Sequence, residues 1–258
     1  MINNMKQEIK RSILHFKVVI AIFMVFTCWY ICGTKYPYES SWIAKYIMVQ
    51  GATVILYASL VFSGYACTLS FCEDYEHSYF RLQIQRKGVI AYTIGKMLGV
   101  ALVSFITYFM GSMLYALFLS AQMPPFQTDS AIQNLQQVSC FGYLLPDNYW
   151  LYIIIQCVCN GLLAMIVCCG AVCVSAWITN KFVTLCMPMI LFWVIFTLAY
   201  YIFHLPSAFD WDLVFSSFSN FERVPLVFWL KIFGNVIGYM TLFCVLFLYK
   251  VKRRYRNE

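Results

Sequence analysis

The chain has 258 residues, of which 62% are hydrophobic and only 11% are charged, and its formal net charge is +7. Ordinary soluble domains contain about 25% charged residues, so the composition excludes a soluble globular protein. Apolar runs of about 20 residues, the length that crosses a bilayer, recur along the chain. We therefore expect an integral membrane protein that forms a single transmembrane domain over residues 1–258.

Residues 1–16 predict a basic amphipathic helix. Apolar side chains recur there at intervals of three and four, and basic side chains fill much of the remaining surface. Such a helix lies in the inner membrane interface, where anionic lipids attract it. The alternative is a frayed tail that only orients the first span. No small-residue cleavage site follows, so a secretory signal peptide is not predicted.

Six membrane-spanning helices are predicted, which makes the fold an all-α membrane protein. Their approximate limits are 17–34, 46–71, 92–120, 150–176, 183–203 and 227–249. If both termini are cytoplasmic, fourteen of the 18 lysines and arginines lie on the cytoplasmic side, in agreement with the positive-inside rule. The net charge then reflects this bias, and nucleic-acid binding is not needed to explain it.

The segment FCEDYEHSYFRLQIQRKG, residues 71–88, is a polar block between the second and third predicted spans. Its acids come first and its bases last, which suits a helix dipole, and Gly88 offers a C-terminal stop. We expect an amphipathic helix of about four turns over 72–88, on the cytoplasmic side, with aromatic side chains on one face.

A connector between two spans needs only a few residues, so we interpret this block as a docking surface for a cytoplasmic partner. The alternative is a helix that packs only on the membrane surface or on its own spans. The candidate docking residues are Glu73, Asp74, Tyr75, Glu76, Tyr79, Phe80 and Arg81.

Polar and small residues inside the predicted spans are further candidates. Gln156 and Asn160 form an i, i+4 amide pair, which either lines a transport pathway or cross-links helices by hydrogen bonds of about 1 kcal/mol or less each. Pairs of glycines at the same spacing are candidates for close helix packing, within one chain or between two copies. These pairs are Gly95 with Gly99 and Gly234 with Gly238.

The aromatic-rich residues 204–226, between the last two spans, predict an outer re-entrant segment that dips back toward the spans as short helices; the alternative is a segment that lies in the outer interface. The chain shows no P-loop, HExxH or G-x-S-x-G motif, so we do not expect an enzyme. Its twelve cysteines include no CxxC pair and its three histidines are scattered, so we expect no bound metal and interpret the cysteines as packing residues. Ionisable groups are almost absent from the predicted spans, which argues against proton- or ion-coupled transport.

The stretch FCEDYEHSYFRLQIQRKGVIAYTIGKMLGVALVSFI resembles the region after the second span of ABC-2-type transporter permeases. In that family an acidic, aromatic stretch leads to an arginine, a basic turn with glycine and a K-x-L opening of the third span. The corresponding residues here are Glu73 to Tyr79, Arg81, Arg86 to Gly88, and Lys96 to Leu98. The chain looks most like the small bacterial permeases that export peptides, including lantibiotic-immunity and cytolytic-toxin exporters.

The resemblance implies a permease subunit of an ATP-driven exporter in the bacterial cytoplasmic membrane. The substrate would be amphipathic, above all a peptide, and would move out of the cytoplasm or inner leaflet. The 72–88 segment would be the coupling helix that docks on a separate ABC ATPase, which would bind ATP and Mg²⁺ while this chain binds no cofactor. A second permease subunit, identical or related, would complete the complex. The alternative function is a membrane scaffold or signalling subunit that docks a cytoplasmic partner without transport.

Overall fold

A computed structural model describes residues 16–35, 41–51, 53–77, 79–125, 139–145, 147–198, 211–215 and 224–257. Within these ranges the chain is helical and contains no strand, which confirms the predicted all-α class for this part of the protein. The elements are α2 (Phe16–Gly33), α3 (Trp42–Gln50), α4 (Thr53–Gly64), α5 (Ser70–Glu76), α6 (Tyr79–Lys87), α7 (Val89–Gln122), the 3₁₀ turn η1 (Gly142–Leu144), α9 (Tyr149–Ser175), α10 (Lys181–Thr197), α11 (Trp211–Val214) and α12 (Pro225–Asn257).

Four of the described helices, α2, α7, α9 and α12, are long and apolar enough to cross a bilayer. They coincide with the spans predicted at 17–34, 92–120, 150–176 and 227–249. Hydropathy places the first three well because their ends coincide with polar residues or turns. The last helix differs, because α12 continues to Asn257 through a basic stretch that hydropathy alone does not count as part of a span.

The other two predicted spans have a different form. The segment expected at 46–71 is divided into α3, with 9 residues, and α4, with 12 residues, and the break follows Gln50 and Gly51. At a rise of 1.5 Å per residue, neither helix alone reaches across the roughly 30 Å of a hydrocarbon core. The segment expected at 183–203 is described as α10, with 17 residues. Six complete spans therefore remain a prediction.

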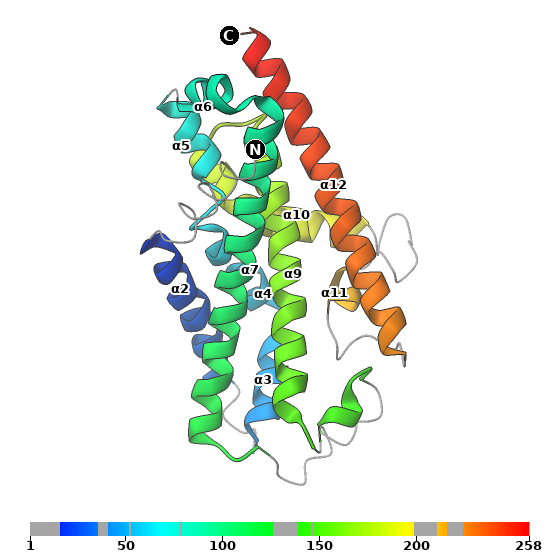
Figure 1. Cartoon of the computed structure of the whole chain (residues 1–258). Coiled ribbons are helices and arrows are strands. Elements are labelled where there is room, and N and C mark those ends of the chain that lie inside the picture. The colour runs from blue at the N-terminus through cyan, green and yellow to red at the C-terminus, as the bar shows by residue number, and fades with distance from the viewer. Residues whose placement is uncertain are drawn as a thin grey trace.

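Helices α7 and α9 pack along each other through the centre of the bundle (Figure 1). Helix α2 packs against α7, and α12 packs against α9 and α7. Of the most apolar 18-residue window in each helix, 78% is buried in α9 but only 28% in α12. A helix that is apolar all round and also covered by protein forms the core, so α9 is the central helix and α12 lies at the periphery.

The predicted four-turn helix over 72–88 is wrong, because the structure has two short helices, α5 and α6, with a break after His77. The break has a packing reason. Phe71 and Phe80 are nine residues apart, so a continuous helix at 100° per residue would place them on opposite faces. After the break, the Phe80 ring packs against Phe71 and Tyr92, with ring centroids 5.9 and 6.0 Å away, and its side chain is 1% exposed.

Gly88 ends α6 as predicted. Its backbone N–H donates to the Ile84 carbonyl at 2.8 Å, and its φ of 78° lies in a region that residues with a Cβ avoid. The chain turns there and begins α7 at the next residue.

Two predicted elements fall largely outside the described residues. Of the N-terminal amphipathic helix, only Phe16 is described, as the first residue of α2. Of the re-entrant segment at 204–226, the described parts are residues 211–215 and 224–226. In α11, the Trp211 side chain is fully buried, and its ring packs edge-on against Tyr239 of α12 with centroids 4.8 Å apart.

Glycines permit two close helix contacts that the GxxxG pattern did not predict. A Cβ added at Gly111 of α7 would lie 2.6 Å from a methyl carbon of Val25 in α2. A Cβ at Gly161 of α9 would lie 2.9 Å from the Phe105 ring of α7. Both distances are too short for real contacts, so these glycines let α2, α7 and α9 approach one another closely.

We predict that Gly111→Ala lowers the free energy of unfolding by about 1–3 kcal/mol, because the new methyl group overpacks the α2–α7 contact. Gly234→Ala is the matched control: it is the same substitution in a helix, at a site where a Cβ would meet nothing within 4 Å. That variant should be unchanged or slightly more stable, since glycine costs a helix about 0.5–1 kcal/mol relative to alanine. Unfolding of both variants in detergent micelles tests this, and equal effects would contradict the packing argument.

Candidate functional site

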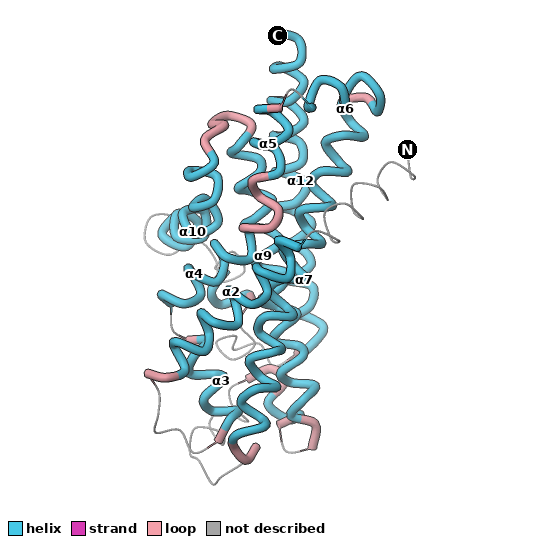
Figure 2. The backbone as a smooth tube through the Cα atoms, turned by 90° about the vertical axis from the view of Figure 1, so that its left-hand side faces the viewer, coloured by secondary structure: helices cyan, strands magenta, loops and turns pink. Residues whose placement is uncertain are grey.

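The α5–α6 pair lies at one end of the bundle, between α4 and α7 in the chain. The C-terminal end of α12 lies at the same end of the bundle in both views (Figures 1 and 2), whereas α3 lies toward the opposite end. Three of the candidate docking residues on α5 are acids, and each of them forms an ion pair with a different helix.

The three ion pairs connect α5 to α2, α7 and α10. Lys17 of α2 lies 2.8 Å from Glu73, and Lys181 of α10 lies 2.6 Å from Glu76. The side chains of these two pairs are between about one third and one half exposed. The hydrogen bond from Lys181 to Glu76 raises the pKa of the Lys181 ammonium group, so this lysine stays charged at neutral pH.

The third pair is buried. Lys96 of α7 lies 2.5 Å from Asp74, and the two side chains are only 8% and 7% exposed. The Tyr92 hydroxyl donates to the same carboxylate oxygen at 3.1 Å, and the Lys96 ammonium group also donates to the Ser70 carbonyl at 2.9 Å. Both charges are thus compensated by a partner and by further hydrogen bonds, which a buried ion pair needs in order to be tolerated.

Aromatic contacts connect the same region to α12. Phe71 of α5 packs edge-on against Phe247, with centroids 5.2 Å apart. The Arg254 guanidinium lies over the Tyr75 ring at 4.8 Å and donates to the Trp177 carbonyl at 3.1 Å. A cation over an aromatic face contributes about 0.5–2 kcal/mol. Helix α5 is therefore attached to α2, α7, α10 and α12.

The structure separates the candidate docking residues by exposure. Asp74 and Phe80 are buried, so neither side chain forms part of a surface, and the prediction that aromatic side chains share one exposed face fails for Phe80. Tyr75 is partly buried beneath Arg254, and Glu73 and Glu76 are half-exposed and paired with lysines, as above.

The exposed face of this end is formed by α6. Tyr79 and Leu82 are each 51% exposed, and Arg81 between them is exposed as well. Ile84 and Phe80, on the other face of α6, are buried in the core. Helix α6 is therefore amphipathic in the structure, and its exposed side chains include an aromatic residue, an aliphatic residue and two arginines, Arg81 and Arg86.

The lysines that bind the acids of α5 were not assigned this role from sequence. One signal pointed to Lys96: it falls inside the predicted span 92–120, and a charge at that depth requires a partner. The partners of the two exposed pairs give no such signal, because Lys17 and Lys181 sit at the ends of helices, where lysines are common.

The amide pair of α9 is buried, with Gln156 1% and Asn160 3% exposed. The Gln156 side-chain amide donates to Asn160 at 3.4 Å and to the Phe215 carbonyl at 3.5 Å, and Gln50 of α3 donates to Asn160 at 3.5 Å. The pair therefore hydrogen-bonds to neighbouring segments in this conformation. The side-chain nitrogen of Asn160 is a buried donor with no acceptor among the described residues, and pathway lining stays a prediction.

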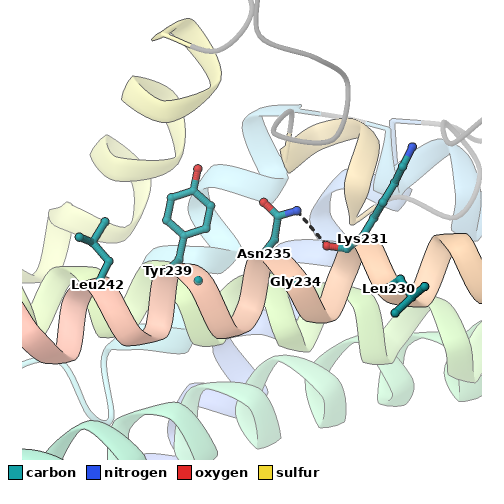
Figure 3. A pocket seen from close by; sticks show the side chains of 7 residues that line it. Leu230, Lys231, Gly234, Asn235, Tyr239 and Leu242 are labelled. Atoms are coloured by element: carbon teal, nitrogen blue, oxygen red, sulfur yellow. Dashed lines mark hydrogen bonds between the residues drawn. The ribbon is translucent and has the colours of Figure 1, made fainter.

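The two glycine pairs lie in different surroundings. Gly95 and Gly99 are buried in α7. Gly234 and Gly238 lie on the exposed face of α12 and form the floor of an open groove of about 500 Å³, whose lining includes Leu230, Tyr239 and Leu242 (Figure 3). A Cβ added at either glycine would meet no atom of the described chain within 4 Å. Whether these glycines pack against a second copy stays a prediction.

None of the twelve cysteines forms a disulfide, and each is buried or partly buried. In the part of the chain that the structure describes, no group of three or more His, Cys, Asp or Glu side chains could hold a metal ion. The chain matches no protein-family model, and comparison with curated proteins and with solved structures gives no significant match.

We predict that Lys96→Met lowers the free energy of unfolding by about 3–5 kcal/mol, because it leaves the Asp74 carboxylate buried without its cation. The double variant Asp74→Leu/Lys96→Met should recover much of this loss, since it removes both charges. Denaturant titration in detergent micelles measures both effects.

Lys181→Gln is the control for this experiment. Lys181 pairs with Glu76, which lies on α5 as Asp74 does, but this second pair is exposed. The effect of this substitution should be much smaller, as solvent screens that pair. Equal losses for Lys96→Met and Lys181→Gln, or a double variant less stable than Lys96→Met, would show that the buried pair is not the main constraint.

Proposed function

We propose that this chain is the membrane subunit of an ATP-driven exporter of the ABC-2 type. One observation carries the proposal. The α5–α6 pair presents an exposed face at one end of the bundle, while ion pairs and aromatic contacts attach it to α2, α7, α10 and α12. A protein that binds the exposed face would therefore act on four helices at once.

This arrangement suits a subunit that receives mechanical work from outside. A partner that pushes on Tyr79 and Leu82 meets a short helix whose opposite face is fixed by Phe80 and Ile84. The buried ion pair between Asp74 and Lys96 resists separation of α5 from α7, so the two would move together. Packed helices have discrete arrangements rather than a continuous range, so such a push would favour one arrangement over another.

The partner in this proposal is a separate ABC ATPase, which would bind ATP and Mg²⁺. The proposed assembly contains two permease subunits, identical or related, in a bacterial cytoplasmic membrane. The α5–α6 end and both termini would be cytoplasmic. In this topology α3 and α4 together form the second span and α10 forms most of the fifth.

An amphipathic peptide is the substrate that the buried amides support best. Gln50, Gln156 and Asn160 place three side-chain amides from two helices next to one another in the core. The nitrogen of Asn160 has no acceptor among the described residues, and an unsatisfied buried donor costs about 1–3 kcal/mol. A backbone carbonyl of a peptide passing this point would satisfy it.

The proposal predicts that the chain, purified from its native membrane in mild detergent, carries a stoichiometric P-loop ATPase with vanadate-sensitive ATP hydrolysis. Tyr79→Ala/Leu82→Ala should still insert into the membrane but weaken ATPase binding by tenfold or more, because each side chain is half exposed and burying that half at an interface contributes about 1 kcal/mol. Mass spectrometry and the hydrolysis assay give both readouts. Phe80→Ala is not a suitable variant, since this side chain belongs to the core.

The control removes the same residue types at the other end of the bundle. Tyr143 and Leu151 are 63% and 47% exposed, in η1 and at the start of α9 (Figure 1), and their double alanine variant should keep the ATPase. If the wild-type chain arrives alone, or with a partner that hydrolyses nothing, the scaffold or signalling function replaces the exporter. If the Tyr79/Leu82 variant keeps the ATPase, docking occurs elsewhere.

A further inference from the structure

The last two turns of α12 divide their basic side chains between two faces. Lys250 and Arg254 point inward: the Lys250 ammonium lies 5.6 Å from the centre of the Trp177 ring, and Arg254 contacts Tyr75 and Trp177. These contacts fix the rotation of the helix about its axis. The remaining three bases of this region, Lys252, Arg253 and Arg256, are therefore held on the outside.

The outer bases form one stripe with an aromatic residue. Tyr249, Lys252, Arg253 and Arg256 follow the spacing i, i+3, i+4 and i+7, which places them on a single face of a helix. Tyr249 is 61% exposed and the three bases are exposed. None of the three bases forms an ion pair within the described ranges. We refer to these four residues as the basic face of α12.

The basic face continues an apolar stripe on the same side of the helix. Leu242, Val245 and Leu246 are 50%, 57% and 39% exposed, and the groove floored by Gly234 and Gly238 lies further along this side (Figure 3). Half of a hydrocarbon core is about 15 Å thick, or about ten residues of helix. The helix from Tyr249 to Gly238, which lies inside the groove, is about this length, so the exposed stripe has the extent of one lipid leaflet.

We propose that the basic face of α12 binds the phosphate of an anionic phospholipid in the leaflet at the α5–α6 end of the bundle. The phosphate contacts Lys252, Arg253 and Arg256, Tyr249 lies at the level of the headgroup, and an acyl chain lies along Leu242, Val245 and Leu246. Two observations favour a lipid over a soluble partner. The basic face is continuous with a lipid-length apolar stripe, and an aromatic residue stands at the boundary between them, as at membrane interfaces generally.

This inference needs only that α12 spans the membrane, and it is independent of any transport activity. It also gives α12 a second attachment. Lys250 and Arg254 contact α5 and the turn after α9, and the basic face of α12 binds the lipid headgroup. The end of α12 is then held between protein and lipid headgroups.

Lipid titration of the purified full-length chain tests the proposal. The probes are a phosphatidylglycerol and the phosphatidylcholine with the same acyl chains, and native mass spectrometry counts the lipid retained. The wild type should retain phosphatidylglycerol in preference to phosphatidylcholine. Arg253→Gln/Arg256→Gln should weaken phosphatidylglycerol binding by about fivefold for each arginine removed, since a base near an anionic headgroup contributes about 1 kcal/mol.

The matched control is Arg81→Gln/Arg86→Gln, which removes two arginines from α6 at the same end of the bundle. It should keep the preference for phosphatidylglycerol, as should the charge-preserving variant Arg253→Lys/Arg256→Lys. Circular dichroism and thermal unfolding in phosphatidylcholine confirm that each variant is folded. Three outcomes would overturn the proposal: an unchanged preference in Arg253→Gln/Arg256→Gln, an equal loss in the α6 control, or displacement of the lipid by millimolar inorganic phosphate.

Discussion

The buried ion pair between Asp74 and Lys96 is the constraint on which the organisation of the α5–α6 end depends. Removing two charges from water is costly, and the cost is recovered only when the geometry is fixed and further hydrogen bonds are made. Here Tyr92 and the Ser70 carbonyl supply those bonds. The pair therefore sets the position of α5 against α7, and the aromatic residues next to it pack in the space that remains.

This constraint explains why a strongly polar segment occurs in so apolar a chain. The acids of α5 are not a free acidic surface, because each has a lysine from another helix beside it. Once these charges are paired, the exposed character of the end comes from Tyr79, Leu82 and the arginines of α6. A docking partner of the proposed kind would meet an apolar and basic face rather than an acidic one.

Sequence reasoning recovered the parts of the fold that depend on local composition. The spans that became α2, α7 and α9 follow from hydropathy, because a run of apolar residues must be helical in a bilayer. The break between α3 and α4 was missed, because Gln50 and Gly51 hardly lower the average hydropathy of a long window. The break between α5 and α6 was missed because the polar pattern fits one helix, and only the packing of Phe80 against Phe71 and Tyr92 excludes it.

The site shows the same division between local and long-range information. Candidate residues on α5 and α6 were identified by their unusual polarity, but their partners Lys17 and Lys181 come from distant parts of the chain and carry no local signal. The glycines show it as well. Gly234 and Gly238 form a GxxxG motif but lie on an open face of α12. Gly111 and Gly161 belong to no GxxxG motif, yet they make the close contacts between helices. Whether a glycine serves helix packing depends on whether a neighbouring helix covers its face, and the spacing of glycines in the sequence does not indicate this.

The peripheral position of α12 has a consequence for biogenesis. It follows every other described helix in the chain, yet it supplies Phe247 and Arg254 to the α5 region and packs against α9. Until it has been inserted, the central helix α9 lacks one of the helices that pack against it. A nascent chain that has not yet reached Pro225 would leave the α12-facing side of α9 and the Phe71 ring of α5 without their partners. Assembly of the core therefore has to wait for a helix that is translated well after α5 and α9.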